Sequence, residues 1–205
     1  MRYFLDTEFI EDGKTIDLIS IGIVAEDGRE YYAQSLDCKL ERANDWVTRN
    51  VLTNLAHLDL SSRERSCRPS RKLGEVVTVG VKHGELCSKP NGFDNGCPWR
   101  YRQSIAHDIL EFCDPKLYGK PEFWGYYADY DWVVLCQLFG AMINLPKGWP
   151  MYCKDLKQLC DDLGNPNLGE AVPQKDEHHA LADARWNKDV YAFLTAREYT
   201  LIGAS

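Results

Sequence analysis

The sequence predicts an α/β fold in which one mixed sheet, made of an antiparallel three-strand meander and additional parallel strands, is flanked by helices. Two observations predict it. Three β-type runs come first and are separated by Asp-Gly dipeptides, and a later aromatic β-type run lies between stretches with helical periodicity. Tight hairpin turns require antiparallel neighbours, whereas a strand reached through a helix favours parallel pairing.

The strands of the meander are expected at residues 2–9, 15–25 and 29–35. Asp-Gly pairs at 12–13 and 27–28 stand at the two junctions, and this dipeptide between apolar runs is a strong signal for a β-hairpin. The middle run is rich in β-branched residues and mostly apolar, as in a strand that is buried on both faces. We therefore expect this run to form the centre of the meander.

Helices are expected in later segments where apolar residues recur at intervals of three and four. They lie at about 41–52, at 99–112, from Asp129 onward, at 155–163 and at about 180–197. In the first of them, Ala43, Trp46, Val47 and Val51 fall at helical spacing. An aromatic strand is expected at 122–127, between the second and third helices.

The segment from 61 to 98 lacks this periodicity and is rich in Ser, Arg, Gly, Asn and Pro, with one β-like stretch at 76–81. We interpret residues 1–205 as a single domain that carries an insertion at about 61–98. Residues 61–102 include nine basic and four acidic side chains, whereas the whole chain has a net charge of −7. This local excess of positive charge is consistent with a binding site for phosphates and equally consistent with a solvated loop. A zinc site would need Cys67, His83, Cys87 and Cys97, whose spacing fits no standard pattern.

Composition restricts the class of protein. A chain of 205 residues with 44% hydrophobic content can bury one core. Asp6 and Glu8 stand where a signal peptide would be basic and then apolar, and no apolar run approaches the ~20 residues of a membrane span. We expect a cytoplasmic protein without a membrane partner, whose eight cysteines are buried thiols. The acidic charge disfavours nucleic-acid binding by bulk electrostatics, but bound metal ions would bring their own positive charge.

Three acidic positions are candidates for a metal site. Asp6 and Glu8 are two residues apart on the first strand, so their side chains share a face, with Cα atoms about 7 Å apart. On its own this pattern is more often a solvated strand end. Asp131 follows the aromatic strand, where open α/β sheets place functional groups. Because Asp129 lies nearer the expected helix start, we assign it the N-cap and keep Asp131 as the ligand candidate.

His178 and Asp183 form an H-x4-D motif at the start of the last helix. Five helical residues turn through about 500°, which would leave the two side chains about 140° apart. We therefore expect His178 in the loop before the helix and Asp183 in its second turn, facing the same site. The apolar stripe that would hold this helix on the sheet comprises Ala182, Trp186, Val190 and Phe193.

In this order, D-x-E, a later Asp after a strand, and H-x4-D resemble the three motifs of the DEDDh family of 3′-to-5′ exonucleases. The order of elements also matches the ribonuclease H-like architecture of that family. More closely, residues 4–13, 21–32 and 135–140 are similar to RNase AS-type exoribonucleases. The resemblance covers roughly 1–56 and 99–200. It implies action on adenylate-rich, single-stranded RNA 3′ ends and assembly into homodimers.

The resemblance also implies two divalent ions, Mg²⁺ or Mn²⁺. Asp6 would bridge both ions, and Glu8 and Asp183 would hold the ion that carries the attacking water. Asp131 would complete the shell directly or through water. His178 would act as the general base, a role that histidine often fills in enzymes. Aromatic residues are candidates for stacking on a terminal base, with core packing as the alternative; these are Phe9, Tyr126 and Tyr127.

Two other functions remain open. The same chemistry on DNA, as in proofreading domains, is one alternative, because nothing in the sequence identifies the sugar. A non-catalytic nucleic-acid-binding module is a different class, but it would have no need for all five residues. Phosphate-loop, dinucleotide-binding, nucleophile-elbow and C-x-x-C patterns do not occur. Incubation of matched RNA and DNA with Mg²⁺ separates the three functions.

Overall fold

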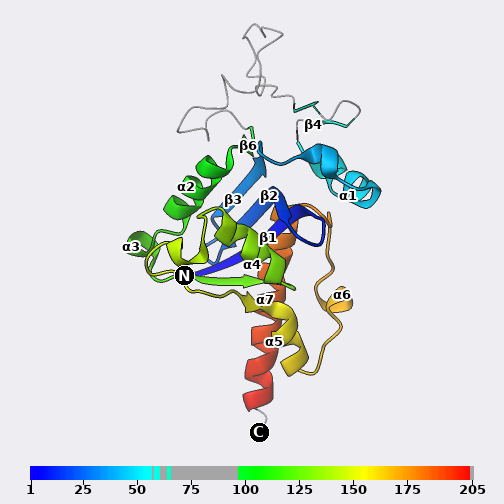
Figure 1. Ribbon diagram of the computed structural model, residues 1–205. Helices are drawn as coiled ribbons and strands as arrows, with labels where there is room; N and C mark the ends of the chain where they lie inside the picture. Colours follow the sequence, from blue (N-terminus) through cyan, green and yellow to red (C-terminus); the bar gives the residue numbers. More distant parts are fainter. Residues whose placement is uncertain (57, 61–63, 66–96, 204–205) are drawn as a thin grey trace, which may run out of the picture.

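The fold is described from a computed structural model, which covers residues 1–56, 58–60, 64–65 and 97–203 (Figure 1). The predicted insertion at 61–98 lies almost wholly outside the described residues. The same holds for the β-like stretch at 76–81 and for three of the four residues of the zinc alternative. Within the described residues, a six-stranded mixed sheet is flanked by helices, and a separate two-stranded sheet is formed by β4 (Leu58–Asp59) and β5 (Glu64–Arg65).

The meander is confirmed. It consists of β1 (Arg2–Glu11), β2 (Ile16–Ala25) and β3 (Glu30–Ser35), all antiparallel. Gly13 and Gly28 adopt φ angles of 78° and 92° in the two turns, a conformation that glycine takes without a steric penalty. β2 lies between the other two strands and is buried along most of its length, as its apolar sequence predicts.

Three further strands extend the meander in parallel. They are β6 (Trp99–Arg100), which pairs with β3, β7 (Glu122–Gly125), which pairs with β1, and β8 (Lys154–Asp155), which pairs with β7. The strand order is therefore β6-β3-β2-β1-β7-β8. The predicted combination of an antiparallel meander with parallel strands in one sheet is thus correct.

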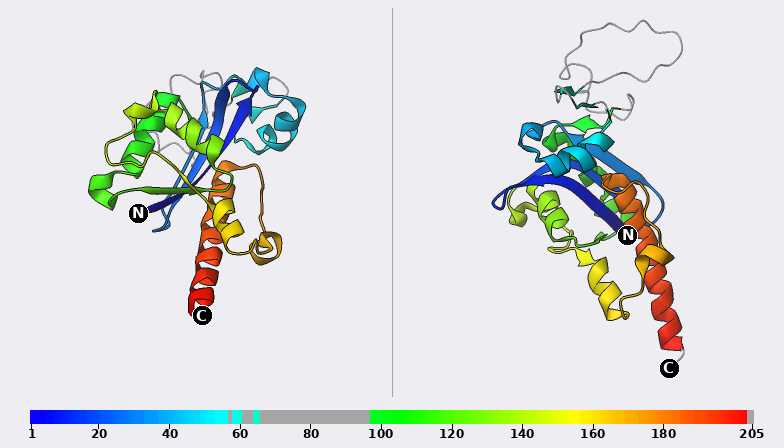
Figure 2. Two further views of the ribbon diagram at one scale, coloured as in Figure 1. Left: turned by 60° about the horizontal axis from the view of Figure 1, so that its bottom comes forward. Right: turned by 90° about the vertical axis from the view of Figure 1, so that its right-hand side faces the viewer.

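Helices cover both faces of the sheet (Figure 2). They are α2 (Arg102–Phe112), α4 (Asp129–Gln137), α5 (Leu156–Asp162) and α7 (Ala180–Gly203). Side chains alternate along β1, so Leu5 packs in the cluster with α2 and α4, whereas Phe4 packs in the cluster with α5 and α7. A β-bulge follows Glu8, because Glu8 pairs with Ser20 but the next residue pairs with Leu18.

A third cluster surrounds α1 (Asp45–Asn50), which lies between the short helices η1 (Leu40–Arg42) and η2 (Leu52–Asn54). Val47 of α1 packs there with Ile19 of β2. The remaining short elements are α3 (Pro115–Tyr118), η4 (Met142–Asn144) and α6 (Leu168–Ala171).

Several expected boundaries were wrong. The helix expected at 41–52 is divided, because Asn44 accepts a hydrogen bond from Val47 N at 2.9 Å and so starts a separate helix. The segment at 99–112 begins as a strand before it becomes α2. The strand expected at 122–127 ends two residues earlier, since Tyr127 turns the chain with a φ of 55°.

The last helix is longer than expected and buries a different face. It ends at Gly203, and its buried positions include Asn187 as well as apolar residues. The fully buried apolar residues are Ala180, Ala184, Val190 and Leu194. Of the expected stripe, Ala182, Trp186 and Phe193 are only partly buried. In the first turn, Ala180 packs closely against Gly22 of β2.

Two expectations from composition can be compared with the described residues. Five of the six described cysteines are buried, as expected. Among the described helices, none combines the length and apolar character that crossing a bilayer requires.

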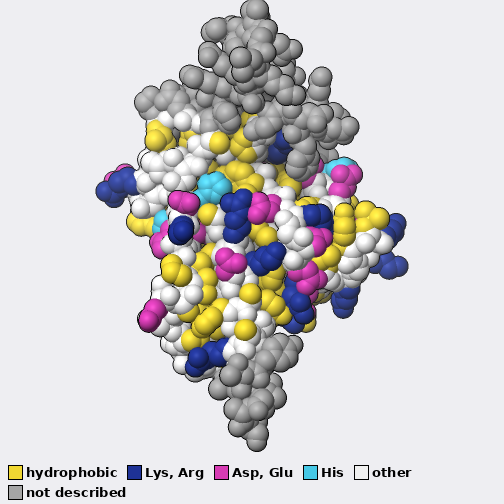
Figure 3. Space-filling model, turned by 180° about the vertical axis from the view of Figure 1, so that it is seen from behind, with side chains coloured by type: hydrophobic (Ala, Val, Ile, Leu, Met, Phe, Trp, Pro, Cys, Tyr) yellow, Lys and Arg dark blue, Asp and Glu magenta, His cyan; other side chains and the backbone are white. Residues whose placement is uncertain are grey.

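On the face opposite that of Figure 1, basic and acidic side chains lie interspersed with hydrophobic ones (Figure 3).

Candidate active site

The site lies where β1 runs past the end of its neighbour β7. The parallel pairing joins Phe4 to Trp124, and β7 ends one residue later, so the edge of β1 continues without a strand beside it. Side chains from two helices form hydrogen bonds with the backbone groups of this edge. Asn187 of α7 donates to Leu5 O at 2.9 Å, and Thr7 N donates to Asp131 Oδ1 of α4 at 2.8 Å. The free edge therefore brings α4 and α7 to the same point.

Asp6 and Glu8 project from β1 toward α7, where they meet Asp183. Ligand oxygens of these three carboxylates all lie within 4.8 Å of one another. Gly22 permits this approach, because a Cβ at this position of β2 would lie 2.3 Å from Ala180 O in the first turn of α7. Asp6 and Glu8 thus share one face of β1, as their spacing predicts. Asp183 lies in the first turn of α7 rather than the second.

Asp131 reaches the site from α4. Thr7 contacts it twice, with Oγ1 at 2.6 Å and N at 2.8 Å, and both donate to Oδ1. Asp131 is buried and follows the carboxyl end of β7, the place that the sequence predicts. The predicted capping role of Asp129 is wrong. Asp129 is the first residue of α4, while the N-cap position belongs to Ala128, whose N–H donates to Asp155 Oδ2.

His178 lies in the turn just before α7, as its spacing from Asp183 predicts. Its N–H donates to Asp183 Oδ2 at 2.9 Å, and its backbone has a φ of 65°. The imidazole meets the ring of Trp46 edge-on, with 4.9 Å between centroids. The neighbouring His179 instead stacks on Tyr32, with 4.7 Å between centroids.

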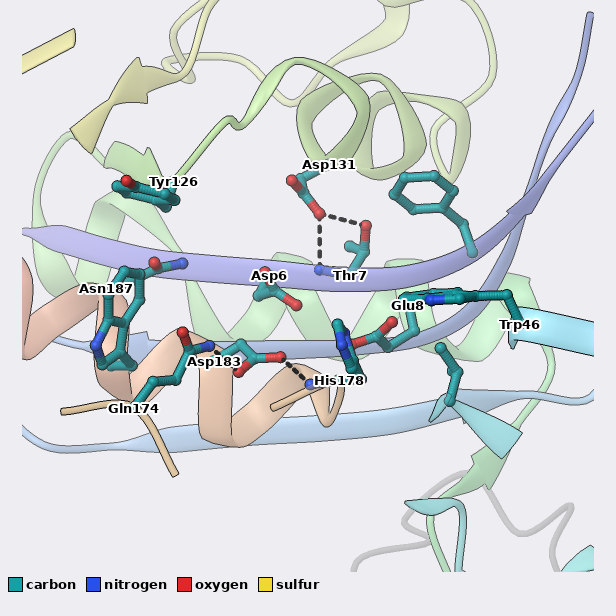
Figure 4. A pocket seen from close by; sticks show the side chains of 13 residues that line it. Asp6, Thr7, Glu8, Trp46, Tyr126, Asp131, Gln174, His178, Asp183 and Asn187 are labelled. Carbon is teal, nitrogen blue, oxygen red and sulfur yellow. Dashed lines mark hydrogen bonds between the residues drawn. The ribbon is translucent and has the colours of Figure 1, made fainter. Parts of the chain in front are cut away.

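These side chains line one pocket of about 340 Å³ (Figure 4). All five residues expected from the sequence lie on its wall. Four aromatic side chains also line it, namely Phe9, Trp46, Tyr126 and Trp186. Within the described part of the chain, no Lys or Arg belongs to the lining. The pocket therefore combines concentrated negative charge with aromatic walls.

Burial raises the pKa of every carboxylate in the pocket, and repulsion from neighbouring pocket carboxylates adds to the rise for Asp6 and Glu8. The pKa of Asp6 rises well above its ordinary value, first because the residue is buried and second because Asp131 is close by. The pKa of Glu8 rises to about 8 through burial and the charge of Asp183. Burial raises the pKa of Asp131 to about 6, although hydrogen bonds from Thr7 oppose the rise.

Asp183 follows the same pattern. Burial raises its pKa, and hydrogen bonds from Gln174 and from the His178 N–H oppose the rise. A bound cation would favour the charged form of all four carboxylates and so lower their raised pKa values. A divalent ion bound by carboxylate oxygens is the compensation that such a donor set suits.

Comparison with known proteins identifies the family. The family model described as "3'-5' exoribonuclease Rv2179c-like domain" matches residues 89–195. Two relatives from Mycobacterium tuberculosis are each 38% identical over 205 residues, covering 100% of this chain and 99% of each relative. They are "3'-5' exoribonuclease MT2234.1" of strain CDC 1551 / Oshkosh and "3'-5' exoribonuclease Rv2179c" of strain ATCC 25618 / H37Rv. The chain belongs to the Rv2179c-like 3'-5' exoribonuclease family.

The segment that matches the Rv2179c-like family model contains several of the pocket residues. Residues 89–195 include Asp131, His178 and Asp183. Asp6 and Glu8 precede the matched segment and lie within the full-length similarity to the two relatives. The similarity to named exoribonucleases thus extends over every element that builds the pocket.

Several pocket residues of this Rv2179c-like chain were missed by sequence reasoning. Gln174 donates from Nε2 to Asp183 Oδ1 at 2.7 Å, and Thr7 contacts Asp131. Gln174 stands in a polar linker that carries no motif, so nothing in its surroundings points to it. Thr7 lies between Asp6 and Glu8 on β1, where successive side chains point to opposite faces, and Asp131 of α4 contacts it at the free edge of the strand.

The aromatic candidates fall into two groups. Phe9 and Tyr126 line the pocket, and Tyr126 packs edge-on against Trp186, with 5.1 Å between centroids. Tyr127 is exposed to 64% and lies outside the lining. Of the three candidates for base stacking, two therefore have access to a ligand in the pocket.

Proposed function

We propose that this protein is a metal-dependent 3′-to-5′ exoribonuclease of the DEDDh type, built as a single domain with a ribonuclease H-like fold. The observation that carries the proposal is the meeting of Asp6, Glu8, Asp131, Asp183 and His178 in one pocket. Supporting it, the chain shares 38% identity over its full length with proteins named 3'-5' exoribonuclease.

The donor set fits divalent metal ions. Asp6, Glu8 and Asp183 offer oxygens within 4.8 Å of one another, and Asp131 lies on the same pocket wall. Burial, and for Asp6 and Glu8 also the charge of neighbouring carboxylates, raises their pKa values, and the described lining contains no Lys or Arg to balance that charge. Hard oxygen donors of this kind suit Mg²⁺ or Mn²⁺. Bound there, two such ions would activate the attacking water and stabilise the leaving 3′ oxygen.

The chain's own residues would supply the remaining parts of the reaction. His178, held at the pocket wall before α7, would accept the proton of the attacking water. Asp183 contacts the His178 N–H and so links the base to the carboxylate cluster. The aromatic rings of Phe9 and Trp46 would pack against a terminal nucleotide and limit the access of water.

The proposed substrate is a single-stranded RNA 3′ end. A pocket of about 340 Å³ is near the lower limit for ligand sites, which suits one terminal nucleotide rather than a duplex. A preference for adenylate, a homodimer and a cytoplasmic location stay predictions that rest on the resemblance to RNase AS-type enzymes. Cleavage of matched adenylate and uridylate oligomers and the mass of the particle in solution would test the first two.

The decisive experiment uses RNA and DNA of matched sequence, each labelled at its 5′ end. With Mg²⁺, the RNA should shorten stepwise from its 3′ end, and a circular RNA should resist. Excess chelator should stop the reaction, and added Mg²⁺ or Mn²⁺ should restore it. Equal shortening of DNA would remove the preference for RNA.

Asp6→Asn should abolish cleavage with an unchanged circular dichroism spectrum, because one carboxylate of the cluster is lost. Asp129→Asn is the matched control, since Asp129 is exposed at the start of α4 and does not line the pocket. Full activity of Asp6→Asn, or activity that resists the chelator, would contradict the proposed function.

A further inference from the structure

The segment that contains α1 and η2 contacts the His178 loop through Asn54 and Trp46. Asn54 Nδ2 donates to His178 O at 3.1 Å and to Glu177 O at 3.3 Å. From the same segment, the ring of Trp46 meets the imidazole of His178 edge-on at 4.9 Å. Asn54 and His178 are 124 positions apart in the sequence, so only the tertiary fold brings them together.

The backbone of His178 needs such contacts. Its φ of 65° lies in the left-handed region, which non-glycine residues occupy at a conformational cost unless their surroundings hold them there. Asp183 accepts a hydrogen bond from the N–H of His178, and Asn54 donates one to its carbonyl. Both polar groups of the His178 backbone are therefore held, one from α7 and the other from η2.

Asn54 is itself anchored and stays clear of the pocket. Its Nδ2 also donates to Asn50 O at 2.9 Å, at the end of α1, so the amide connects α1 with the His178 loop. Asn54 does not line the pocket, whereas Trp46 does. Asn54 therefore has no direct contact with a ligand in the pocket and reaches the site through the His178 loop and α1.

We propose that Asn54 is a positioning residue, which orients His178 by holding its carbonyl group while Trp46 holds its ring. The proposal rests on the proposed function, in which His178 accepts a proton. A general base works only within hydrogen-bond reach of the proton, and displacement by about 1 Å can cost about 100-fold in rate. Asn54→Ala should lower kcat by about 10- to 100-fold and leave KM nearly unchanged.

A double-mutant cycle tests whether Asn54 acts through His178. The cycle compares the full chain with Asn54→Ala, His178→Ala and the double variant, at saturating Mg²⁺ on an RNA oligomer. Asn54→Ala should lower kcat in the parent protein but have no further effect once His178 is absent. A purely structural role would lower the activity of both backgrounds alike. Thermal melting verifies that each variant is folded.

Two more variants complete the design. Thr53→Ala is the matched control, because Thr53 precedes Asn54 and its hydroxyl donates to Arg49 O at 2.9 Å without reaching the His178 loop. Its kcat should equal that of the parent. Asn54→Asp keeps the side-chain volume but removes the N–H donors, so it should lose kcat as Asn54→Ala does. This variant serves the test if Asn54→Ala fails to fold.

The outcomes distinguish the positioning role of Asn54 from the proposed function. Parental kcat in folded Asn54→Ala or Asn54→Asp, a change in KM alone, or equal losses in both backgrounds would overturn the positioning role and leave the proposed function intact. Full activity of His178→Ala would overturn the assignment of the base, and the positioning role with it.

Discussion

Replacing Glu8 by Gln should stabilise the metal-free protein, by an amount that grows with pH. In the folded state the pKa of Glu8 rises from 4.5 to about 8, through burial and the charge of Asp183. Between these two pH values the folded state binds more protons than the unfolded state, so the free energy of unfolding falls as pH rises. Gln cannot ionise, so the free energy of unfolding of Glu8→Gln lacks this decrease with pH.

The size of the effect follows from the two pKa values. A group with a pKa of 4.5 when unfolded and about 8 when folded withdraws about 3 kcal/mol of stability at pH 7 and about 4 kcal/mol at pH 8. Glu8 is partly exposed, and solvent screening reduces the pH 7 value to roughly 2 kcal/mol. For a chain of this size, that corresponds to a melting temperature higher by roughly 4–8 °C. Near pH 4 the difference should vanish, because both states are then protonated.

Thermal unfolding with excess chelator at pH 4.5, 7 and 8 measures the effect. Glu41→Gln is the control, since Glu41 is an exposed glutamate that does not line the pocket. If the proposed metal site is correct, saturating Mg²⁺ should reverse the order of stability, because binding would stabilise the parent more than Glu8→Gln, which lacks the negative charge of the carboxylate. A gain for Glu8→Gln that is the same at all three pH values, or a loss at pH 8, would refute the reasoning from burial and repulsion.

Two further predictions concern the start of α7. His178→Ala should lose about 10²- to 10⁴-fold in kcat, whereas His179→Ala should be much milder, because His179 stacks on Tyr32 outside the pocket lining; the reverse ranking in steady-state assays would contradict the assignment. Gly22→Ala should lower the free energy of unfolding by about 1–3 kcal/mol and also reduce activity. The added methyl group would lie 2.3 Å from Ala180 O and push the first turn of α7 away from the carboxylates, and unchanged urea unfolding would argue against this close packing.

The parts of the fold that depend on neighbouring residues could be predicted from the sequence. The two Asp-Gly turns, the apolar central strand and the alternation that places Asp6 and Glu8 on one face are local properties. The position of His178 also followed from local geometry, because its five-residue interval to Asp183 is incompatible with a shared helical face. Asp131 was chosen over Asp129 from its position after the aromatic strand and farther from the expected helix start, and the order of the family motifs agreed with that choice.

Boundaries and caps were predicted less well. Asp129 was expected to cap α4 because Asp is a frequent N-cap residue. In the structure, the N–H of Ala128 bonds to Asp155, a residue that the sequence places 27 positions away. Likewise, the helix expected at 41–52 gave way to three short helices because Asn44 caps a new helix start. Helix boundaries and caps of this kind depend on which hydrogen-bond partner the tertiary fold brings close to the helix end.

The identity of the carboxylates and the histidine, and their order along the chain, were thus determined by residue types at short spacing. Their meeting in one pocket was decided by the tertiary structure, because β7 ends beside Phe4 and leaves the edge of β1 free for Asp131 and Asn187. The contacts of Gln174 and Asn54 have the same origin. Their hydrogen-bond partners are set by the packing of separate elements, and an amide side chain in a polar segment carries no sign of which partner it will meet.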